Sequence, residues 1–266
     1  MKIKKFLVIG NPIDHSMSPK LHNYWFKVNN IPAVYEKKLV NEKDIGEIIE
    51  KVRIGEIKGI NVTVPYKNTV VPFLDRLTPE ASITKSVNTI SFEGKEVVGH
   101  NTDVAGFELA IRYTKFNVNK KKVLIIGAGG VVPSIIYSLE KMKADEICLM
   151  NRTKENAEKI KKNFKNIKVL SWGESSDFDM IINATSIGLN QEDKLDLDLS
   201  KFGKNKFFYD VIYKPKITFF LNQAKTLGNQ IENGEKMFIY QAHQAFFIWN
   251  KMLPKIDQEV IDLISL

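Results

Sequence analysis

A lysine at the end of a buried strand is the first residue of this sequence that is placed for chemistry. Lys67 closes the stretch 61–67, in which an alternating apolar run is stopped by Pro65 because proline cannot donate to a strand ladder. An ammonium group on a long side chain can stabilise a developing alkoxide and donate a proton to it. A solvated surface lysine is the alternative interpretation in so lysine-rich a chain, and other stretches must decide.

Polar side chains gather at further strand ends in the first half of the chain. The residues after the first strand include Ser16 and Ser18, and Asn88 leads on toward Asn101 and Asp103. Open α/β sheets bind ligands at the carboxyl ends of their strands, and serine hydroxyls at a helix start suit a carboxylate. These hydroxyls, amides and one acid–base pair predict a site for a hydroxyl-rich small molecule. Taken singly, Ser18 also fits a plain helix cap, and the two asparagines fit turns.

A glycine turn in the second half is typical of a dinucleotide site. A buried apolar strand leads into the turn, which consists of Gly127, Ala128, Gly129 and Gly130. Gly127 permits the tight turn, Gly129 lets the backbone approach a pyrophosphate, and the following helix N-terminus supplies N–H groups. Val132 stands where the usual pattern has its third glycine. A purely structural strand–helix turn is the alternative interpretation.

The residues after the next strand indicate which dinucleotide binds. An NAD site usually carries an acidic residue about 20 positions on, where it holds the ribose 2′-hydroxyl. This chain has instead Asn151, Arg152, Thr153 and Lys154. Arg152 can stack on adenine and pair with a 2′-phosphate, while Thr153 caps the next helix and donates to that phosphate. We therefore expect NADP(H), against the alternative that Arg152 and Lys154 are ordinary solvated charges.

Strand and helix patterns alternate along the chain. The expected strands are 6–10, 33–39, 59–64, a hairpin over 86–99, 122–126, 146–150, 167–170, 180–183 and 207–211. The expected helices are 18–29, one from 41, 102–115, 134–143, 153–164, 237–251 and a short one at the end of the chain. This βαβ succession implies a parallel sheet with helices on both faces.

Composition bounds the class of protein. The chain has 266 residues, of which 44% are hydrophobic and 26% charged, as in ordinary globular proteins. It has no apolar run of membrane-spanning length and no signal peptide pattern, so we expect a cytoplasmic protein. One cysteine, Cys148, excludes an internal disulfide and a cysteine-based zinc site, and no metal is expected. The net charge of +8 is scattered and favours small anionic ligands over a nucleic-acid partner.

The chain resembles the shikimate dehydrogenase family over nearly its whole length. The matching motifs are residues 10–23, 61–67, 88–89, 101–103, 127–130, 151–153, 183–186, 213–215 and 234–241. The resemblance implies an enzyme that reduces 3-dehydroshikimate to shikimate with NADPH, on the way to chorismate and the aromatic amino acids. It also implies two α/β domains, a substrate-binding and catalytic domain at 1–103 plus 236–266, and a doubly wound Rossmann-type NADP domain at 104–235.

The resemblance further implies roles for single residues. Ser16 and Ser18 should hold the substrate carboxylate, with Tyr213 nearby. The groups expected around the ring and the reacting carbon are Thr63, Lys67, Asn88, Asp103 and Gln241. The expected cofactor contacts are Gly127, Ala128, Gly129, Gly130, Val131, Asn151, Arg152, Thr153, Lys154, Val211 and Gly234. Lys67 and Asp103 should form the catalytic pair, and whether Lys67 itself transfers the proton stays open because a carboxylate and burial act on it oppositely.

Several features depart from the family pattern or leave alternatives open. Val131, Val132 and Pro133 follow the glycine turn where the family often has small residues, and this bulk bears on cofactor affinity. His243, which replaces a usually small residue, is expected to be structural, and His15 and His22 are expected to pack or cap. The alternative functions are a quinate/shikimate dehydrogenase of the same fold, a non-catalytic NADP-binding relative and, last, a nucleic-acid binder. We expect a monomer or homodimer with a small-molecule substrate and no membrane partner.

Overall fold

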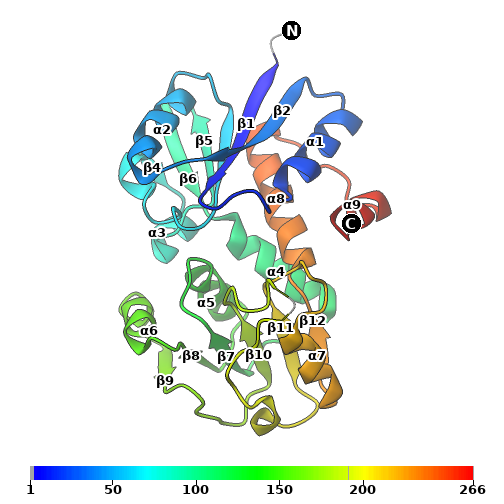
Figure 1. Ribbon diagram of the computed structural model, residues 1–266. Coiled ribbons are helices and arrows are strands. Elements are labelled where there is room, and N and C mark those ends of the chain that lie inside the picture. Colours follow the sequence, from blue (N-terminus) through cyan, green and yellow to red (C-terminus); the bar gives the residue numbers. More distant parts are fainter. Residues whose placement is uncertain (1–2, 191, 266) are drawn as a thin grey trace. The chain divides into compact units, whose positions relative to one another are not determined.

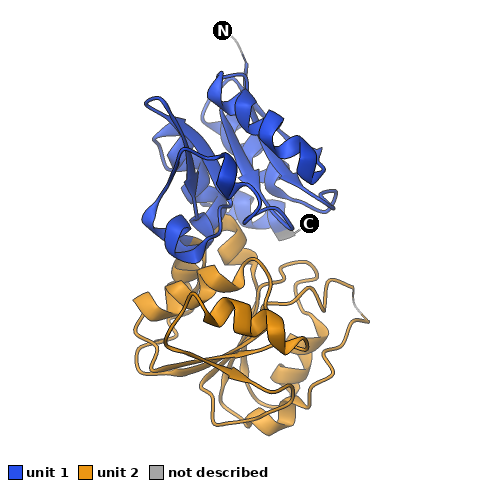
Figure 2. Cartoon of the chain, turned by 90° about the vertical axis from the view of Figure 1, so that its left-hand side faces the viewer, with its two compact units in different colours: residues 1–105, 240–266 blue, residues 106–239 orange. Residues whose placement is uncertain are grey.

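The computed structural model describes residues 3–190 and 192–265, and the chain divides into two compact units (Figure 2). Unit 1 consists of residues 1–105 and 240–266, and unit 2 of residues 106–239. The chain passes from one unit to the other inside two helices, α4 (Thr102–Thr114) and α8 (Glu235–Asn250). The observed units divide after residues 105 and 239, and the domain boundaries expected from the resemblance were 103 and 235.

The described part of unit 1 contains a six-stranded mixed sheet with the strand order β2-β1-β3-β5-β6-β4 (Figure 1). Its strands are β1 (Lys4–Gly10), β2 (Ala33–Leu39), β3 (Gly59–Val62), β4 (Arg76–Leu77), β5 (Thr89–Glu93) and β6 (Glu96–His100). Strands β2, β1 and β3 are parallel, whereas β5 is antiparallel to both β3 and β6. Since β4 is parallel to β6, five of the six strands run in one direction, and only β5, in the expected hairpin, runs against them.

Helices cover both faces of this sheet. They are α1 (Ser18–Val28), η1 (Glu42–Asp44), α2 (Ile45–Arg53), η2 (Val71–Phe73), α3 (Pro79–Thr84), α9 (Gln258–Ser265) and the second part of α8. Successive side chains of a strand point to opposite faces. Leu7 and Ile60 point to the face that buries the apolar stripe of α2, represented by Ile48 and Val52.

The opposite face of the unit 1 sheet is aromatic. The Phe6 ring lies 5.1 Å from that of Phe26 on α1 and 5.0 Å from that of Trp249 on α8. Gly59 shares this face, and a Cβ there would meet the Trp249 indole nitrogen at 2.2 Å. Helix α8 therefore depends on a glycine for its close approach to the sheet, and this approach carries Gln241 on the same helix into unit 1.

The described part of unit 2 contains a six-stranded parallel sheet with the order β12-β11-β10-β7-β8-β9. Its strands are β7 (Lys122–Ile126), β8 (Glu146–Met150), β9 (Ile167–Leu170), β10 (Met180–Asn183), β11 (Phe207–Asp210) and β12 (Gln230–Glu232). Its helices are α5 (Val132–Lys141), α6 (Lys154–Lys161), η3 (Leu199–Phe202), α7 (Phe219–Thr226) and parts of α4 and α8. The strand order reverses between β7 and β10, which makes the sheet doubly wound with a switch point there.

Both faces of the unit 2 sheet are buried. The Tyr209 ring packs edge-on against Phe107 of α4 at 5.4 Å, and the Phe208 ring packs against Phe220 of α7 at 5.4 Å. Adjacent residues of β11 thus serve opposite layers, as the twofold side-chain period of a strand requires. The continuous apolar run of each strand, such as residues 123–126, follows from burial on both faces.

Some element ends differ from the expected ones. Helix α1 begins at Ser18 with Met17 in the cap position, so Ser18 is the first helical residue and not the cap. Strand β3 ends at Val62, and Val64, expected in the strand, is 59% exposed. Helix α5 begins at Val132, two positions early, because Pro133 fits the first turn of a helix. Helix α7 and strand β12 were not expected, and within the described residues no helix is long and apolar enough to cross a membrane.

Candidate active site

Lys67 and Asp103 form a buried ion pair in unit 1. Lys67 lies in the turn that follows β3, and Asp103 lies in the first turn of α4. The distance from Lys67 Nζ to Asp103 Oδ2 is 2.5 Å, and the two side chains are only 12% and 8% exposed. Charges so poorly solvated interact more strongly than an ion pair on the surface. The structure therefore brings together the two residues expected to form an acid–base pair.

Asn88 holds the second oxygen of the same carboxylate. Its Nδ2 donates to Asp103 Oδ1 at 2.8 Å, and its Oδ1 accepts from the Thr102 backbone N–H at 2.7 Å. Gln241 Oε1 lies 3.4 Å from Asn88 Nδ2. Asn101, which also fits a turn, accepts from the Asp103 backbone N–H at 3.1 Å and so caps α4. These residues make one polar cluster at an edge of the unit 1 sheet.

The expected carboxylate-binding serines follow β1 at the carboxyl end of the same sheet. The Ser18 backbone N–H donates to Ser16 Oγ at 3.4 Å. The loops after β1 and β3 are joined by a hydrogen bond from the Asn11 N–H to the Val64 carbonyl at 3.0 Å. Where these loops meet, a Cβ on Gly10 would lie 2.5 Å from the Thr63 methyl group. The absence of a side chain at Gly10 thus allows the loop after β1, which contains Ser16 and Ser18, to lie against Thr63.

The glycine turn after β7 combines a close backbone approach at Gly127 with open space at Gly129. Gly127 has φ +116°, and a Cβ there would come within 2.9 Å of the Ala184 backbone. At exposed Gly129, by contrast, the nearest atom a Cβ would meet is the Ala184 oxygen at 3.9 Å. A side chain there would fill open space in front of the turn. Val132 is fully buried, so its bulk points into the core and does not obstruct this space.

The residues expected to read the 2′-phosphate are exposed. Arg152, Thr153 and Lys154 follow β8 and all lie in contact with solvent. Asn151 Nδ2 donates to the Thr153 carbonyl at 2.7 Å and so shapes the turn. Thr153 holds the cap position of α6, but among the described residues its side chain makes no capping hydrogen bond. Thr153 is thus the N-cap residue as expected, although its hydroxyl does not supply the capping hydrogen bond.

Asp210 is a buried carboxylate that sequence reasoning missed. It accepts hydrogen bonds from Thr218 Oγ1 at 2.7 Å, from the Ile212 N–H at 3.0 Å and from Asn183 Nδ2 at 3.1 Å. Burial raises the pKa of Asp210 from 3.8 to about 6, against the lowering effect of these donors. The carboxylate thus ties the end of β10 to the segment after β11. A lone acidic residue at the end of an apolar strand was the available signal.

The other expected contacts at this edge of unit 2 lie near the end of β11. A Cβ on Gly234 would lie 2.1 Å from the Val211 carbonyl oxygen, so these two backbone segments touch. The Tyr213 ring stacks on that of Phe238 at 4.6 Å. Val211 and Gly234 are thereby brought together, and Tyr213 is placed on the same segment within unit 2.

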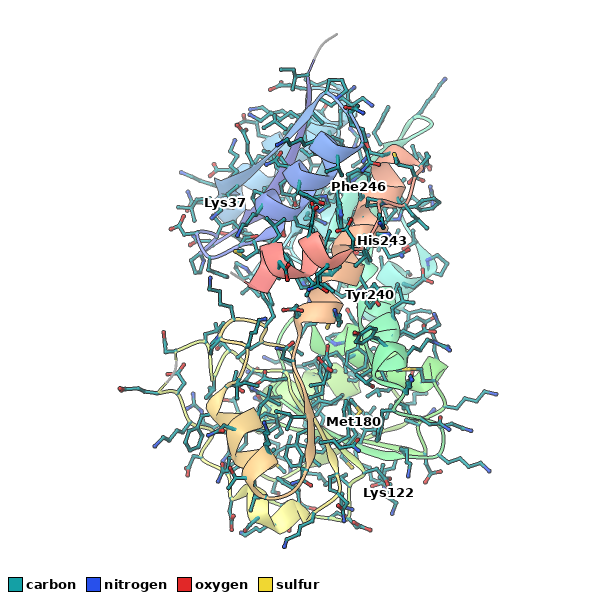
Figure 3. The ribbon with its side chains drawn as sticks, turned by 90° about the vertical axis from the view of Figure 1, so that its right-hand side faces the viewer. Lys37, Lys122, Met180, Tyr240, His243 and Phe246 are labelled. Carbon is teal, nitrogen blue, oxygen red and sulfur yellow. The ribbon has the colours of Figure 1, made fainter. Side chains whose placement is uncertain are left out.

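His22 and His243 make packing or backbone contacts, and Cys148 is buried. His22 is fully buried, its ring stacks on Tyr35 at 4.4 Å, and burial lowers its pKa to about 3. His243 Nε2 lies 2.8 Å from the Pro254 carbonyl, and Figure 3 shows it beside Phe246 along α8. Burial raises the pKa of Cys148 to about 12, which makes its thiol inert. The described ranges hold no group of three or more metal-ligating side chains.

Comparison with known proteins agrees with the resemblance seen in the motifs. Residues 8–90 match the model of a shikimate dehydrogenase substrate binding domain, and residues 108–194 match that of a shikimate / quinate 5-dehydrogenase. A shikimate dehydrogenase (NADP(+)) of Pelagibacter ubique is 53% identical over 262 residues, which cover 98% of this chain and 99% of that protein. The chain belongs to the shikimate dehydrogenase family.

Solved structures of the family share the fold over nearly the whole chain. A shikimate dehydrogenase crystallised in complex with NADP+ matches with a TM-score of 0.91 at 32% identity, covering 98% of this chain and 94% of that one. The Thermus thermophilus enzyme in complex with NADP(H) and shikimate matches with a TM-score of 0.89 at 26% identity, covering 99% and 98%. Unit 1 contains the match to the family's substrate-binding domain, and unit 2 the match to its dehydrogenase domain.

Proposed function

We propose that this chain catalyses the reversible, NADPH-dependent reduction of 3-dehydroshikimate to shikimate. The observation that carries the proposal is the Lys67–Asp103 pair, buried and braced by Asn88, in a chain of the shikimate dehydrogenase family. An ammonium group fixed on a buried carboxylate is suited to a reaction that develops negative charge on an oxygen. The intact Lys67–Asp103 pair argues against a non-catalytic relative.

Unit 1 supplies the acid–base chemistry. When bound, NADPH supplies the hydride that turns a ketone carbon into a secondary alcohol carbon. Lys67 stabilises the developing alkoxide and hands a proton to that oxygen, so one proton leaves the enzyme for each alcohol formed. Asp103 keeps the Lys67 ammonium in place and accepts a hydrogen bond from a substrate hydroxyl. The Asn88 amide donates to Oδ1 of Asp103 and so fixes this carboxylate, whose Oδ2 accepts from Lys67.

Further groups orient the substrate. Ser16 and Ser18 bind its carboxylate through their hydroxyls, which stand at the start of α1 where the helix dipole favours an anion. Thr63 and Gln241 contact ring hydroxyls, and Gln241 gains its orientation from the contact with Asn88. Tyr213 adds a contact to the carboxylate. Neutral donors and acceptors of this kind discriminate strongly against analogues that lack a hydroxyl.

Unit 2 supplies the cofactor site. Arg152 and Lys154 pair with the 2′-phosphate, and Thr153 donates to it. Gly234 and Val211 take the nicotinamide end. The backbone contacts to the pyrophosphate and its neighbours come from Gly127, Ala128, Gly129, Gly130, Val131 and Asn151. The open space in front of Gly129 supports this assignment. We expect the enzyme in the cytoplasm. We also expect a monomer or homodimer, and sedimentation of the purified chain tests this oligomeric state.

The experiment that tests the function pairs two substrates with two cofactors. The purified chain is assayed by NADPH or NADH absorbance with shikimate and with quinate, each with NADP+ and with NAD+. We expect the highest kcat/KM with shikimate and NADP+. A preference for quinate with NAD+ would instead identify a quinate-type enzyme. Binding of NADPH without turnover of any substrate would overturn the catalytic assignment.

A further inference from the structure

A buried tyrosine of unit 1 is connected to the catalytic pair without touching it. Tyr35 lies on β2 and Asn61 on β3, and both strands flank β1, in which Phe6 pairs with Tyr35 and Val8 with Asn61. Since Phe6 and Val8 point to one face, so do Tyr35 and Asn61. Tyr35 Oη donates to Asn61 Oδ1 at 2.6 Å.

The orientation of the Asn61 amide is fixed by its other partners. Asn61 Nδ2 donates to the Asn88 backbone carbonyl at 3.0 Å and to Thr89 Oγ1 at 2.9 Å. A backbone carbonyl can only accept, so the amide nitrogen must face it and the amide oxygen must face Tyr35. Asn61 is 6% exposed, and the Tyr35 hydroxyl is the donor that satisfies its oxygen.

From Asn61 the hydrogen bonds continue to the active site. Thr89 Oγ1 donates to Asn88 Oδ1 at 3.2 Å, and Asn88 Nδ2 donates to Asp103 Oδ1 at 2.8 Å. Each hydrogen bond from Tyr35 onward is donated in the direction of the Asp103 carboxylate. Lys67 donates to Oδ2 of this carboxylate, the oxygen that Asn88 does not contact. Hydrogen bonds in such a chain polarise one another. The chain begins at the Tyr35 hydroxyl, which also has a side-chain hydrogen bond with Ser18.

The ring of Tyr35 is held so that its hydroxyl cannot turn away. It is 1% exposed and stacks on His22 with an interplanar angle of 1° and a centroid distance of 4.4 Å. Trp249 of α8 lies 6.1 Å away on the same aromatic face. Burial also raises the pKa of Tyr35 well above its usual value, so the phenol keeps the proton that it donates.

We propose that Tyr35 is a positioning residue for the reaction: through Asn61, Thr89 and Asn88 its hydroxyl fixes the Asp103 carboxylate that orients Lys67. The inference rests on the function proposed above. Tyr35→Phe keeps the ring in its stack and removes the hydroxyl. This leaves the buried Asn61 amide oxygen without its donor and takes away a partner of the Ser18 side chain. The Asn61 amide then loses its fixed orientation. The hydrogen bonds that it donates to Thr89 Oγ1 and to the Asn88 carbonyl are weakened as a result.

The kinetic test compares four variants with the wild type, namely Tyr35→Phe, Tyr24→Phe, Asn88→Ala and the double variant Tyr35→Phe/Asn88→Ala. Tyr35→Phe should lower kcat/KM for shikimate about tenfold while KM for NADP+ changes less than about twofold, because a buried acceptor is left unpaired on the substrate side only. Tyr24→Phe is the control, since its hydroxyl donates to Glu259 at 2.7 Å on the surface of the same unit, and it should behave as wild type. In an Asn88→Ala background, Tyr35→Phe should have no further effect, since the chain is already broken.

Unfolding in urea tests the link without any turnover. The side chains of Tyr35 and Asn88 are connected through those of Asn61 and Thr89. If these hydrogen bonds couple them, the double variant should lose less unfolding free energy than the sum of the two single losses. Additive unfolding effects, or independent multiplication of the two kinetic effects, would overturn the inference. A wild type that binds no shikimate would refute the proposed function, whereas the unfolding cycle would still decide whether Tyr35 is coupled to Asn88.

Discussion

Replacing Lys67 by methionine is the sharpest test of the proposed chemistry. Methionine keeps most of the side-chain length and removes the ammonium group, so that the site loses its proton donor with little loss of volume. General acid catalysis and charge stabilisation together predict a fall in kcat for 3-dehydroshikimate of about 10²–10⁴. KM should change little in comparison, because the groups proposed to bind the substrate, Ser16, Ser18 and the amides, are unchanged.

The same substitution should also destabilise the protein. The Asp103 side chain is 8% exposed and loses the ammonium group that lies 2.5 Å away, so that Asn88 Nδ2 is left as its side-chain donor. Removing one partner of a buried pair costs about 3–5 kcal/mol of unfolding free energy. The double variant Lys67→Met/Asp103→Asn removes the uncompensated charge and should recover most of this loss. It should not recover kcat, which separates the chemical role of Lys67 from its structural one.

The assay measures initial rates with 3-dehydroshikimate and NADPH, together with urea unfolding of each variant. Lys5→Met is the matched control, because Lys5 pairs with Glu36 at 2.8 Å in unit 1 while both side chains are about half exposed. An exposed pair contributes about 0–1 kcal/mol, so this variant should be close to wild type in rate and stability. Near-normal turnover in Lys67→Met would refute the assigned role. A double variant as unstable as the single one would refute the argument from the unpaired carboxylate.

Three further predictions concern the cofactor site and the aromatic core. Arg152→Asp should raise KM for NADPH far more than KM for NADH, since a carboxylate repels the 2′-phosphate; equal changes would contradict phosphate recognition. Gly234→Ala should raise KM for NADPH, because its Cβ would meet the Val211 carbonyl oxygen at 2.1 Å and displace backbone; an unchanged KM would show that the contact does not shape the site. The pKa of His22 falls from 6.5 to about 3 on folding, so the unfolded chain binds a proton in this range that the folded chain does not, and stability is lost as pH falls from about 6.5 to about 3. His22→Phe should flatten this loss in thermal unfolding; Asp210, whose pKa rises to about 6, acts in the opposite sense and is unchanged in the variant.

Elements with a strong local pattern were predictable from the sequence. Strands β7 and β8 have the expected bounds, since each is a short apolar run between charged residues and turns. Helix α7 was missed although its Thr218 is an N-cap that accepts from the Leu221 N–H at 3.3 Å. Its neighbouring proline and lysines hid a short amphipathic segment, so the cap residue was the better signal.

The candidate site was predictable where a motif holds several polar residues together. Lys67, Asn88 and Asp103 stand in such motifs, and the structure brings their side chains into contact. Asn61 and Tyr35 were not assigned roles. Asn61 is a single polar side chain in the apolar strand β3, Tyr35 precedes the charged residues of β2, and the partner of each lies on a different strand. Their importance depends on pairing across β1, which a linear pattern does not contain.

The mixed sheet of unit 1 explains how three separate segments reach one carboxylate. In a parallel sheet only the carboxyl ends of strands meet at the edge that binds ligands. Because β5 is antiparallel to β3 and β6, its beginning lies at the edge where both of those strands end, with Thr89 opposite Asn61 and His100. Asn88 before β5, Lys67 after β3 and Asp103 after β6 are thereby placed side by side. The β5–β6 hairpin, which breaks the βαβ pattern, is therefore the feature that assembles the acid–base site, and an all-parallel version of this sheet would leave Asn88 at the opposite edge.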